Sequence, residues 1–202
     1  KYQTFLLHAP TLLYQYSLTA KLLNSCRNVL ILLPEISQAN LLYNSLKEIF
    51  KDRICILHSE MSGGRRTENI EGIISGKHDI VLGTRSALFA PLTTVSLIIV
   101  LNEHSSSYKP EEGIRYNMRD IAVMRGFIEK AAVLLSSVTP SVDSYFNSIA
   151  NKYRLIKPAA SAKRPRVKII DMRFEKIIRP QLSKTVFDSL KNRLNNGKKI
   201  ML

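Results

Sequence analysis

Short apolar runs alternate with longer amphipathic stretches along most of this chain, and this alternation constrains its fold more than any other feature. The stretches 12–25, 37–50 and 64–75 place apolar residues three and four positions apart, as one face of a helix requires. The runs between them are short and almost wholly apolar, which is typical of strands that are buried on both faces. Such runs, each expected to form a strand, lie at 5–7, 29–33, 54–57, 80–82, 97–101 and 133–135.

Strands that alternate with helices predict βαβ crossovers and a mostly parallel sheet with helices on both faces, so the expected fold class is α/β. A fourth helical stretch covers residues 115–129. A further helix is expected to begin near Thr139, with this residue as its N-cap, because a threonine hydroxyl accepts a hydrogen bond from a free amide. Pro140 then falls in the first turn, where its missing N–H costs little.

Residues 151–166 interrupt this pattern, because the segment NKYRLIKPAASAKRPR is basic, contains two prolines and shows little periodicity. We interpret it as a linker. Beyond it we expect a strand at 167–171, a helix at about 181–195 and the start of another strand at 198–202. The predicted organisation is a complete domain at 1–155, a basic linker at 156–166 and the beginning of a second domain at 167–202.

The positive charge of the chain is concentrated in its last quarter. Residues 1–150 carry 15 Lys and Arg against 13 Asp and Glu, whereas residues 151–202 carry 15 against 3. This excess predicts a polyanionic partner, most simply nucleic acid, whose phosphates release counterions when they are bound. A solvated linker and a surface for an acidic protein stay open as alternatives. The densest group of cations comprises Lys163, Arg164, Arg166 and Lys168.

Membrane, metal and disulfide chemistry have no support in the sequence. No apolar run reaches the length that crosses a bilayer, so we expect no membrane partner. Cys26 and Cys55 lack the paired spacing of a zinc site or a disulfide framework, which favours a reducing cytoplasm. His58 and His104 also lack the spacing of metal ligands, and we expect no metal site.

Several stretches coincide, in chain order, with one family. GTRSALFAPL (83–92) and EHSSSYKPEEGIRYNMRD (103–120) are the most specific because of their length. Shorter matches are LLPEIS (32–37), LHSEMS (57–62), TPSVDSY (139–145) and VKIIDMR (167–173). On these stretches the chain resembles the helicase core of the bacterial replication-restart helicases, the primosomal protein N′ (PriA) family of superfamily 2.

The resemblance implies a fold and a setting. Residues 1 to about 155 look like a first RecA-like lobe of the P-loop NTPase type, and residues from 167 onward look like the start of a second lobe. Active relatives use ATP and magnesium. The implied partners are forked or single-stranded DNA and other primosome or replication proteins, and the implied location is the bacterial cytoplasm at the nucleoid.

The segment that matches the family's phosphate-binding loop departs from its G-x-x-x-x-G-K-[ST] pattern. In that pattern glycines let backbone N–H groups surround the phosphates, while the lysine and the hydroxyl serve phosphate and magnesium. Here the segment reads LLHAPTLLYQYSLTAK from position 6, with Gln15 at the lysine position and Tyr16 at the hydroxyl position. Pro10 removes a backbone donor. The glycine positions hold Ala9, Leu12 and Tyr14.

The acidic motif of the family, D-E-E-H, is also altered. The corresponding residues are Leu101, Asn102, Glu103 and His104, so only the last two are retained. Leu101 cannot help to hold magnesium, and Asn102 cannot accept a proton from attacking water. Because phosphoryl transfer depends on this positioning and on the metal, we expect no ATP hydrolysis and predict no cofactor.

A loop rich in aromatic and basic residues follows the altered acidic motif. In the family a similar loop couples DNA contact to nucleotide turnover, and rings among cations suit single-stranded DNA. The alternative is structural, with the tyrosines packing the loop and the arginines pairing with nearby acids. The candidate residues are Tyr108, Lys109, Arg115, Tyr116 and Arg119.

Thr84, Arg85 and Ser86 resemble a second DNA-contact motif of the family. They follow the strand expected at 80–82, at the carboxyl edge where parallel sheets usually bind ligands. A turn closed by the two hydroxyls, with a solvated Arg85, explains them equally well.

Three functions stay open for the whole chain. The preferred one is a helicase-like DNA-binding domain of a replication-restart protein that does not hydrolyse ATP. The others are an active ATP-dependent 3′–5′ DNA helicase and a non-catalytic scaffold whose basic end binds an acidic protein. DNA-stimulated ATP turnover separates the first two, and salt-dependent DNA affinity separates the first from the third.

Overall fold

The structure, a computed structural model, describes residues 2–109, 116–159, 167–179 and 182–200. The chain divides into two compact units, Lys1–Ala162 and Lys163–Leu202. We describe each unit by itself. The lobe assignments made from the sequence stay predictions.

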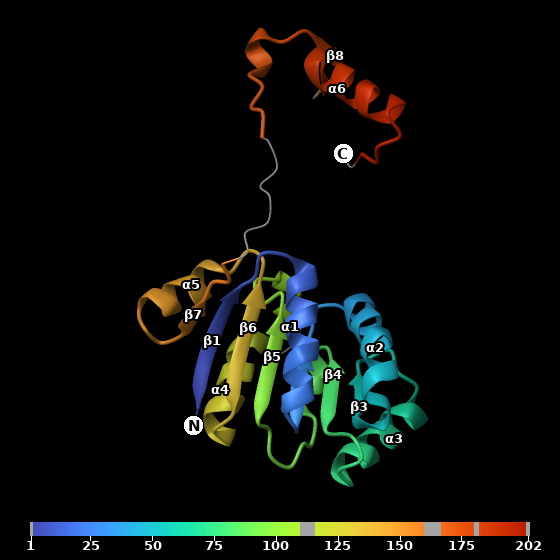
Figure 1. The fold of residues 1–202 in the computed structure, drawn as a ribbon, viewed down its shortest axis with the longest axis vertical. Coiled ribbons are helices and arrows are strands. Elements are labelled where there is room, and N and C mark those ends of the chain that lie inside the picture. The colour runs from blue at the N-terminus through green and yellow to red at the C-terminus, as the bar shows by residue number, and fades with distance from the viewer. Residues whose placement is uncertain (1, 110–115, 160–166, 180–181, 201–202) are drawn as a thin grey trace. The chain divides into compact units, whose positions relative to one another are not determined.

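The first unit is built on one parallel sheet of seven strands (Figure 1). All six strands expected from the sequence belong to it. The seventh strand, β7, pairs with β1 and lies within residues 151–166. This segment, which the sequence predicts to be a linker, is therefore in part a strand. The strand order is β3-β4-β2-β5-β6-β1-β7. The bounds are β1 (Gln3–His8), β2 (Val29–Leu32), β3 (Ile54–Leu57), β4 (Ile80–Gly83), β5 (Leu97–Leu101), β6 (Ala132–Ser137) and β7 (Arg154–Ile156).

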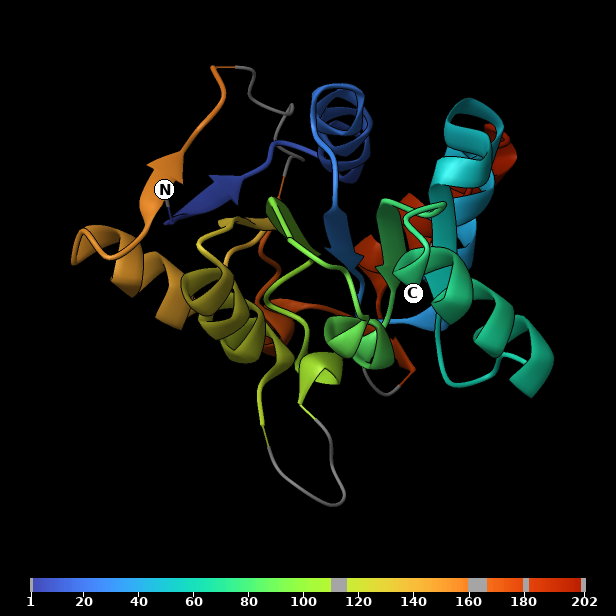
Figure 2. The ribbon, with the colours of Figure 1, turned by 90° about the horizontal axis from the view of Figure 1, so that it is seen from below.

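Helices cover both faces of the sheet, which confirms the α/β class (Figure 2). Neighbouring residues of a strand point to opposite faces, so Leu6 joins one apolar cluster and Leu7 the other. Leu23 and Leu42 bring α1 and α2 to the cluster of Leu7. The cluster of Leu6 includes Ile73 of α3 and Ala122 of α4. The helices are α1 (Leu12–Ser25), α2 (Ile36–Phe50), α3 (Gly63–Ile74), α4 (Met118–Glu129) and α5 (Val142–Ile149).

The start of α5 differs from the sequence prediction. Ser141 is the N-cap, and its hydroxyl accepts from the amide of Ser144 at 3.2 Å. Thr139 lies two residues before this cap, and its amide donates to the Ser137 hydroxyl at 2.9 Å. A distant side chain decides this start: the carboxylate of Glu103 accepts from the Ser141 amide at 2.7 Å.

The second unit also departs from the sequence prediction. Residues 167–171 and 198–200 form no strand. Val167 and Ile169 are 82% and 91% exposed, so they have no apolar surface within this unit to pack against. The described residues of this unit form a 3₁₀ turn η4 (Met172–Phe174), the antiparallel pair β8 (Ile177–Arg179) and β9 (Leu182–Ser183), and α6 (Lys184–Asn195).

Gly83, the last residue of β4, lies where two backbones approach most closely. A Cβ atom at this position would lie 1.9 Å from the Leu57 carbonyl oxygen of the neighbouring strand. The next amide, that of Thr84, donates to the same oxygen at 3.2 Å. The close approach therefore sets the direction in which the chain leaves β4, at the carboxyl edge of the sheet.

We expect Gly83→Ala to lower the free energy of unfolding by about 2–3 kcal/mol, because the added methyl group meets backbone that cannot move aside easily. Urea denaturation of the purified variant measures this. The matched control is Gly64→Ala in α3, where an added Cβ meets nothing within 4 Å. That control is expected to be neutral or slightly stabilising, and equal losses in the two variants would contradict the steric explanation.

Candidate nucleic-acid interface

The segment that matches the phosphate-binding loop is a short, tightly bonded turn. Between the end of β1 and the start of α1 lie only three residues, 9–11. Ala9 is buried, and its amide donates to the Ser137 carbonyl at 2.8 Å. Thr11 caps α1 by accepting from the amide of Tyr14 at 3.1 Å. The amides of Ala9 and Tyr14 are thus already bonded within the protein.

A network of neutral amides joins the two altered motifs. The Gln15 side chain is 1% exposed, and its Nε2 donates to Oδ1 of Asn102 at 3.3 Å. Ser136 donates to Oε1 of Gln15 at 2.8 Å. Asn102 in turn donates to Oε1 of Gln38 on α2 at 2.9 Å. The positions that the resemblance assigns to a lysine and an acid therefore contact each other as an uncharged pair.

These residues do not fit magnesium and a nucleoside triphosphate. Leu101 is fully buried in the sheet core, and no member of the amide network carries a charge. Burial raises the pKa of Tyr16, so this phenol stays neutral. Magnesium requires oxygen ligands in octahedral geometry, usually including a carboxylate. Within the part of the chain that the structure describes, no group of three or more His, Cys, Asp and Glu side chains could hold a metal ion.

The retained acid of this motif, Glu103, holds the start of α5. Its carboxylate is 2% exposed and accepts from the amide of Ser141 at 2.7 Å. The hydroxyls of Ser141 and Ser144 also donate to it, at 2.9 and 2.8 Å. An acid at a helix N-terminus stabilises the helix by binding its free amide groups. His104, the other retained residue, is exposed and shares a 2.7 Å hydrogen bond with the Ser137 hydroxyl.

Arg119, expected as a DNA contact, is instead buried among acids. Its guanidinium lies 3.4 Å from the Glu103 carboxylate, 2.8 Å from Asp120 and 3.6 Å from Asp143. Burial alone would lower the pKa of Arg119, but the hydrogen bonds and charges of Asp120 and Glu103 raise it above its ordinary value. This geometry matches the structural alternative given above.

The contacts of Tyr108 are also structural, because its hydroxyl bonds to the backbone within the protein. The ring is fully buried, and the hydroxyl lies within hydrogen-bond distance of the carbonyl oxygens of Leu32 and Leu101, at the ends of β2 and β5, which share its single proton. Burial, followed by the nearby charge of Glu103, raises the pKa of Tyr108 well above its usual value. The hydroxyl therefore remains protonated and keeps the ends of these two strands together.

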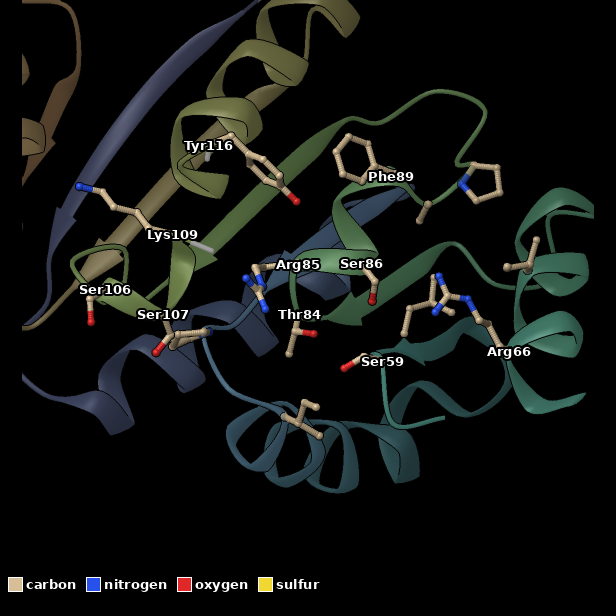
Figure 3. A pocket seen from close by; sticks show the side chains of 16 residues that line it. Ser59, Arg66, Thr84, Arg85, Ser86, Phe89, Ser106, Ser107, Lys109 and Tyr116 are labelled. Carbon is tan, nitrogen blue, oxygen red and sulfur yellow. The ribbon is translucent and has the colours of Figure 1, made fainter. Parts of the chain in front are cut away.

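The other described candidates of the first unit line a single groove of about 1110 Å³ (Figure 3). Thr84, Arg85 and Ser86 line it directly after the end of β4. Lys109 lies after β5 in the chain, and Tyr116 lies just before α4. The structure thus brings together residues that are up to 32 positions apart in the sequence. Additional lining residues include Ser59, Arg66, Phe89, Ser106 and Ser107.

The groove is cationic and rich in hydroxyl groups. Arg66, Arg85 and Lys109 line it, and the described lining residues include no Asp or Glu. The buried hydroxyl of Ser86 has no hydrogen-bond partner among the residues that the structure describes. Such a surface can offer charges and donors to phosphate groups.

Sequence reasoning missed Arg66 and Phe89. Arg66 lies on the exposed first turns of α3, where nothing in the sequence distinguishes it from the adjacent Arg65. Among the other predicted DNA contacts, Lys168 is exposed and belongs to the second unit. Arg115, Lys163, Arg164 and Arg166 lie outside the described residues.

Comparison with curated proteins finds similarity over almost the whole chain. A replication restart protein PriA of Rickettsia prowazekii is 38% identical over 180 residues, which is 87% of this chain. The PriA proteins of Chlamydia trachomatis and Bacillus subtilis are 35% and 32% identical, each over 87% of the chain. The resemblance to PriA is confirmed. The chain spans only 28%, 24% and 23% of the length of these three PriA proteins, and no family model matches it.

Solved structures support the RecA-like helicase fold. The C-terminal domain of S. cerevisiae Dbp5 superimposes with a TM-score of 0.59 over 78% of this chain and 90% of that domain, at 13% identity. The E. coli DEAD-box protein SrmB gives 0.51 over 84% of this chain and 97% of its own, at 17% identity. At these identities the likeness concerns the fold alone. In the described part of the chain, no helix is long and apolar enough to cross a membrane.

We expect Glu103→Ala to lower the free energy of unfolding by about 3 kcal/mol. It removes a buried charge partner of Arg119 and the hydrogen bonds that the carboxylate accepts at the start of α5. Thermal or urea unfolding measures the loss. Asp143→Ala is the control, since this carboxylate is 73% exposed although it faces the same guanidinium. An exposed ion pair contributes about 1 kcal/mol or less, so a similar loss in both variants would refute the framework role of Glu103.

Proposed function

We propose that this chain is the helicase-like DNA-binding part of a replication-restart protein and that the groove described above binds single-stranded or forked DNA. The observation that carries the proposal is the groove itself, where Arg66, Arg85 and Lys109 meet without a lining acid among the described residues. It lies at the carboxyl ends of parallel strands, the usual ligand edge of such sheets. Similarity to PriA proteins supports a role in replication restart.

We further propose that the chain does not hydrolyse ATP. Phosphoryl transfer needs cations that neutralise the phosphates and a group that orients the attacking water. The contact between Gln15 and Asn102 supports the proposal, because it places a neutral amide pair where both functions are needed. DNA binding is then the surviving activity, without a cofactor. This role implies other replication or primosome proteins as partners. It implies the bacterial nucleoid as the location.

The groove predicts a salt-dependent affinity for single strands. Arg85→Ala and Lys109→Ala are each expected to weaken binding of an oligothymidylate several-fold and to reduce the slope of log affinity against log salt by about 1, since each removes one phosphate contact. Fluorescence anisotropy at several salt concentrations measures both quantities.

Lys21→Ala serves as the matched control, because Lys21 is an exposed cation of α1 that does not line the groove. Equal losses in all three variants would mean that binding follows net charge and not the groove. Negligible binding of DNA at physiological salt would favour a scaffold that meets an acidic protein.

ATP turnover tests the second proposal. With DNA present, we expect the rate of ATP hydrolysis to equal that of Gln15→Ala, because the unaltered side chain already lacks a charge for the phosphates. The assay uses the full-length protein and a phosphate-release readout. A rate well above that of Gln15→Ala would overturn the proposal and favour the active helicase.

A further inference from the structure

Phe89 is an aromatic residue that the groove exposes to solvent. Its side chain is 67% exposed, although the two residues before it, Ala87 and Leu88, are fully buried. The ring lies at the end of the 3₁₀ turn η2 (Arg85–Phe89), which also carries Arg85 and Ser86. Figure 3 shows Phe89 and Tyr116 on the side of the groove formed by η2 and the residues before α4.

The backbone on both sides of Phe89 is held by one arginine, Arg125, whose side chain is 15% exposed. Arg125 of α4 donates to the carbonyl oxygens of Leu88 and Ala90, the latter at 3.0 Å. Glu129 holds the same guanidinium through a 2.6 Å contact with Nε. Its second carboxylate oxygen accepts from the amide of Val95 at 3.2 Å. The phenyl ring therefore projects from a fixed segment and not from a free loop.

A ring held in this way suits an unpaired nucleobase. Stacking a base on an aromatic side chain requires an accessible π-face close to cations that meet the backbone phosphates. Phe89 has the exposed ring, while Arg85 and Lys109 line the same groove. Bases of a duplex are stacked on one another and paired, so only a single strand can offer a base to this ring. Because the segment is already ordered, little conformational entropy is lost on binding.

We propose that Phe89 stacks on one base of a single-stranded nucleic acid whose phosphates contact Arg85 and Lys109, and that Arg125 and Glu129 are positioning residues for this ring. This proposal rests on the proposed function, since it assigns a specific subsite within the same groove. It adds a selectivity that charge alone does not supply, namely a preference for strands that carry unpaired bases.

The first experiment compares a base-bearing strand with an abasic one of equal length and charge. Stacking contributes about 1–3 kcal/mol per base, which corresponds to roughly 5- to 150-fold in affinity. We expect Phe89→Ala to weaken binding of oligothymidylate by about tenfold and to leave binding of the abasic strand unchanged. Phe146→Ala is the control, because Phe146 is 65% exposed on α5 and does not line the groove.

The second experiment observes stacking directly. The chain contains no tryptophan, so Phe89→Trp introduces a single indole emitter at the proposed subsite. Oligothymidylate is expected to quench its emission, whereas the abasic strand is expected to bind with little quenching. Adding Arg125→Lys to Phe89→Trp, which preserves the charge but cannot reach both carbonyl oxygens, should reduce the quenching while the melting temperature and abasic binding change little.

The outcomes separate this proposal from the one on which it rests. If Phe89→Ala binds oligothymidylate normally while Arg85→Ala does not, the groove binds DNA but the stacking subsite is refuted. If neither variant changes binding, both proposals fall. If Phe89→Ala weakens binding of duplex, abasic and base-bearing strands alike, the ring supports the groove only structurally, and the stacking proposal is also refuted.

Discussion

Every strand of the first unit runs in the same direction, and both faces of the sheet are buried by helices. This constraint decides where polar chemistry can occur. Most side chains within the strands are apolar, and the polar residues that follow the strands converge at one edge. The contact between Gln15 and Asn102, the ion pair of Glu103 and Arg119 and the cationic groove share the carboxyl edge of the sheet.

Residues at this edge differ in the free energy that it costs to bury them, because some are charged and others are neutral. Gln15 and Asn102 are neutral and need only hydrogen bonds when they are buried together. Glu103 and Arg119 are charged and buried, so neither can be removed without leaving its partner uncompensated. Arg66, Arg85 and Lys109, which line the groove, are exposed. This division separates the buried ion pair of Glu103 and Arg119 from the uncharged contact between Gln15 and Asn102.

Residue types in a motif do not by themselves show whether a side chain is buried or open to a ligand. Tyr108 and Arg119 match the aromatic-rich loop of the helicases. In the structure, however, Tyr108 hydrogen-bonds to a strand end, and Arg119 hydrogen-bonds to the N-cap of α5. Phe89 lies in the well-matched stretch GTRSALFAPL, but nothing in that stretch shows that its ring is exposed while Ala87 and Leu88 are buried. The hydrogen bonds from Arg125 to the backbone beside Phe89 form when α4 packs against η2. The exposure of the Phe89 ring is also a property of the packed structure.

Periodicity and residue chemistry are local properties, and they are enough to predict the α/β class and strands β1 to β6. The sequence also shows neutral side chains at Gln15 and Asn102. It did not determine β7, the capping of α5 by Ser141 or the short strands of the second unit. Only the tertiary structure decided that Gln15 contacts Asn102 and that Arg66, Phe89 and Lys109 share one groove. The reason is physical: these contacts join residues far apart in the chain, and their geometry follows from how the sheet and its helices pack.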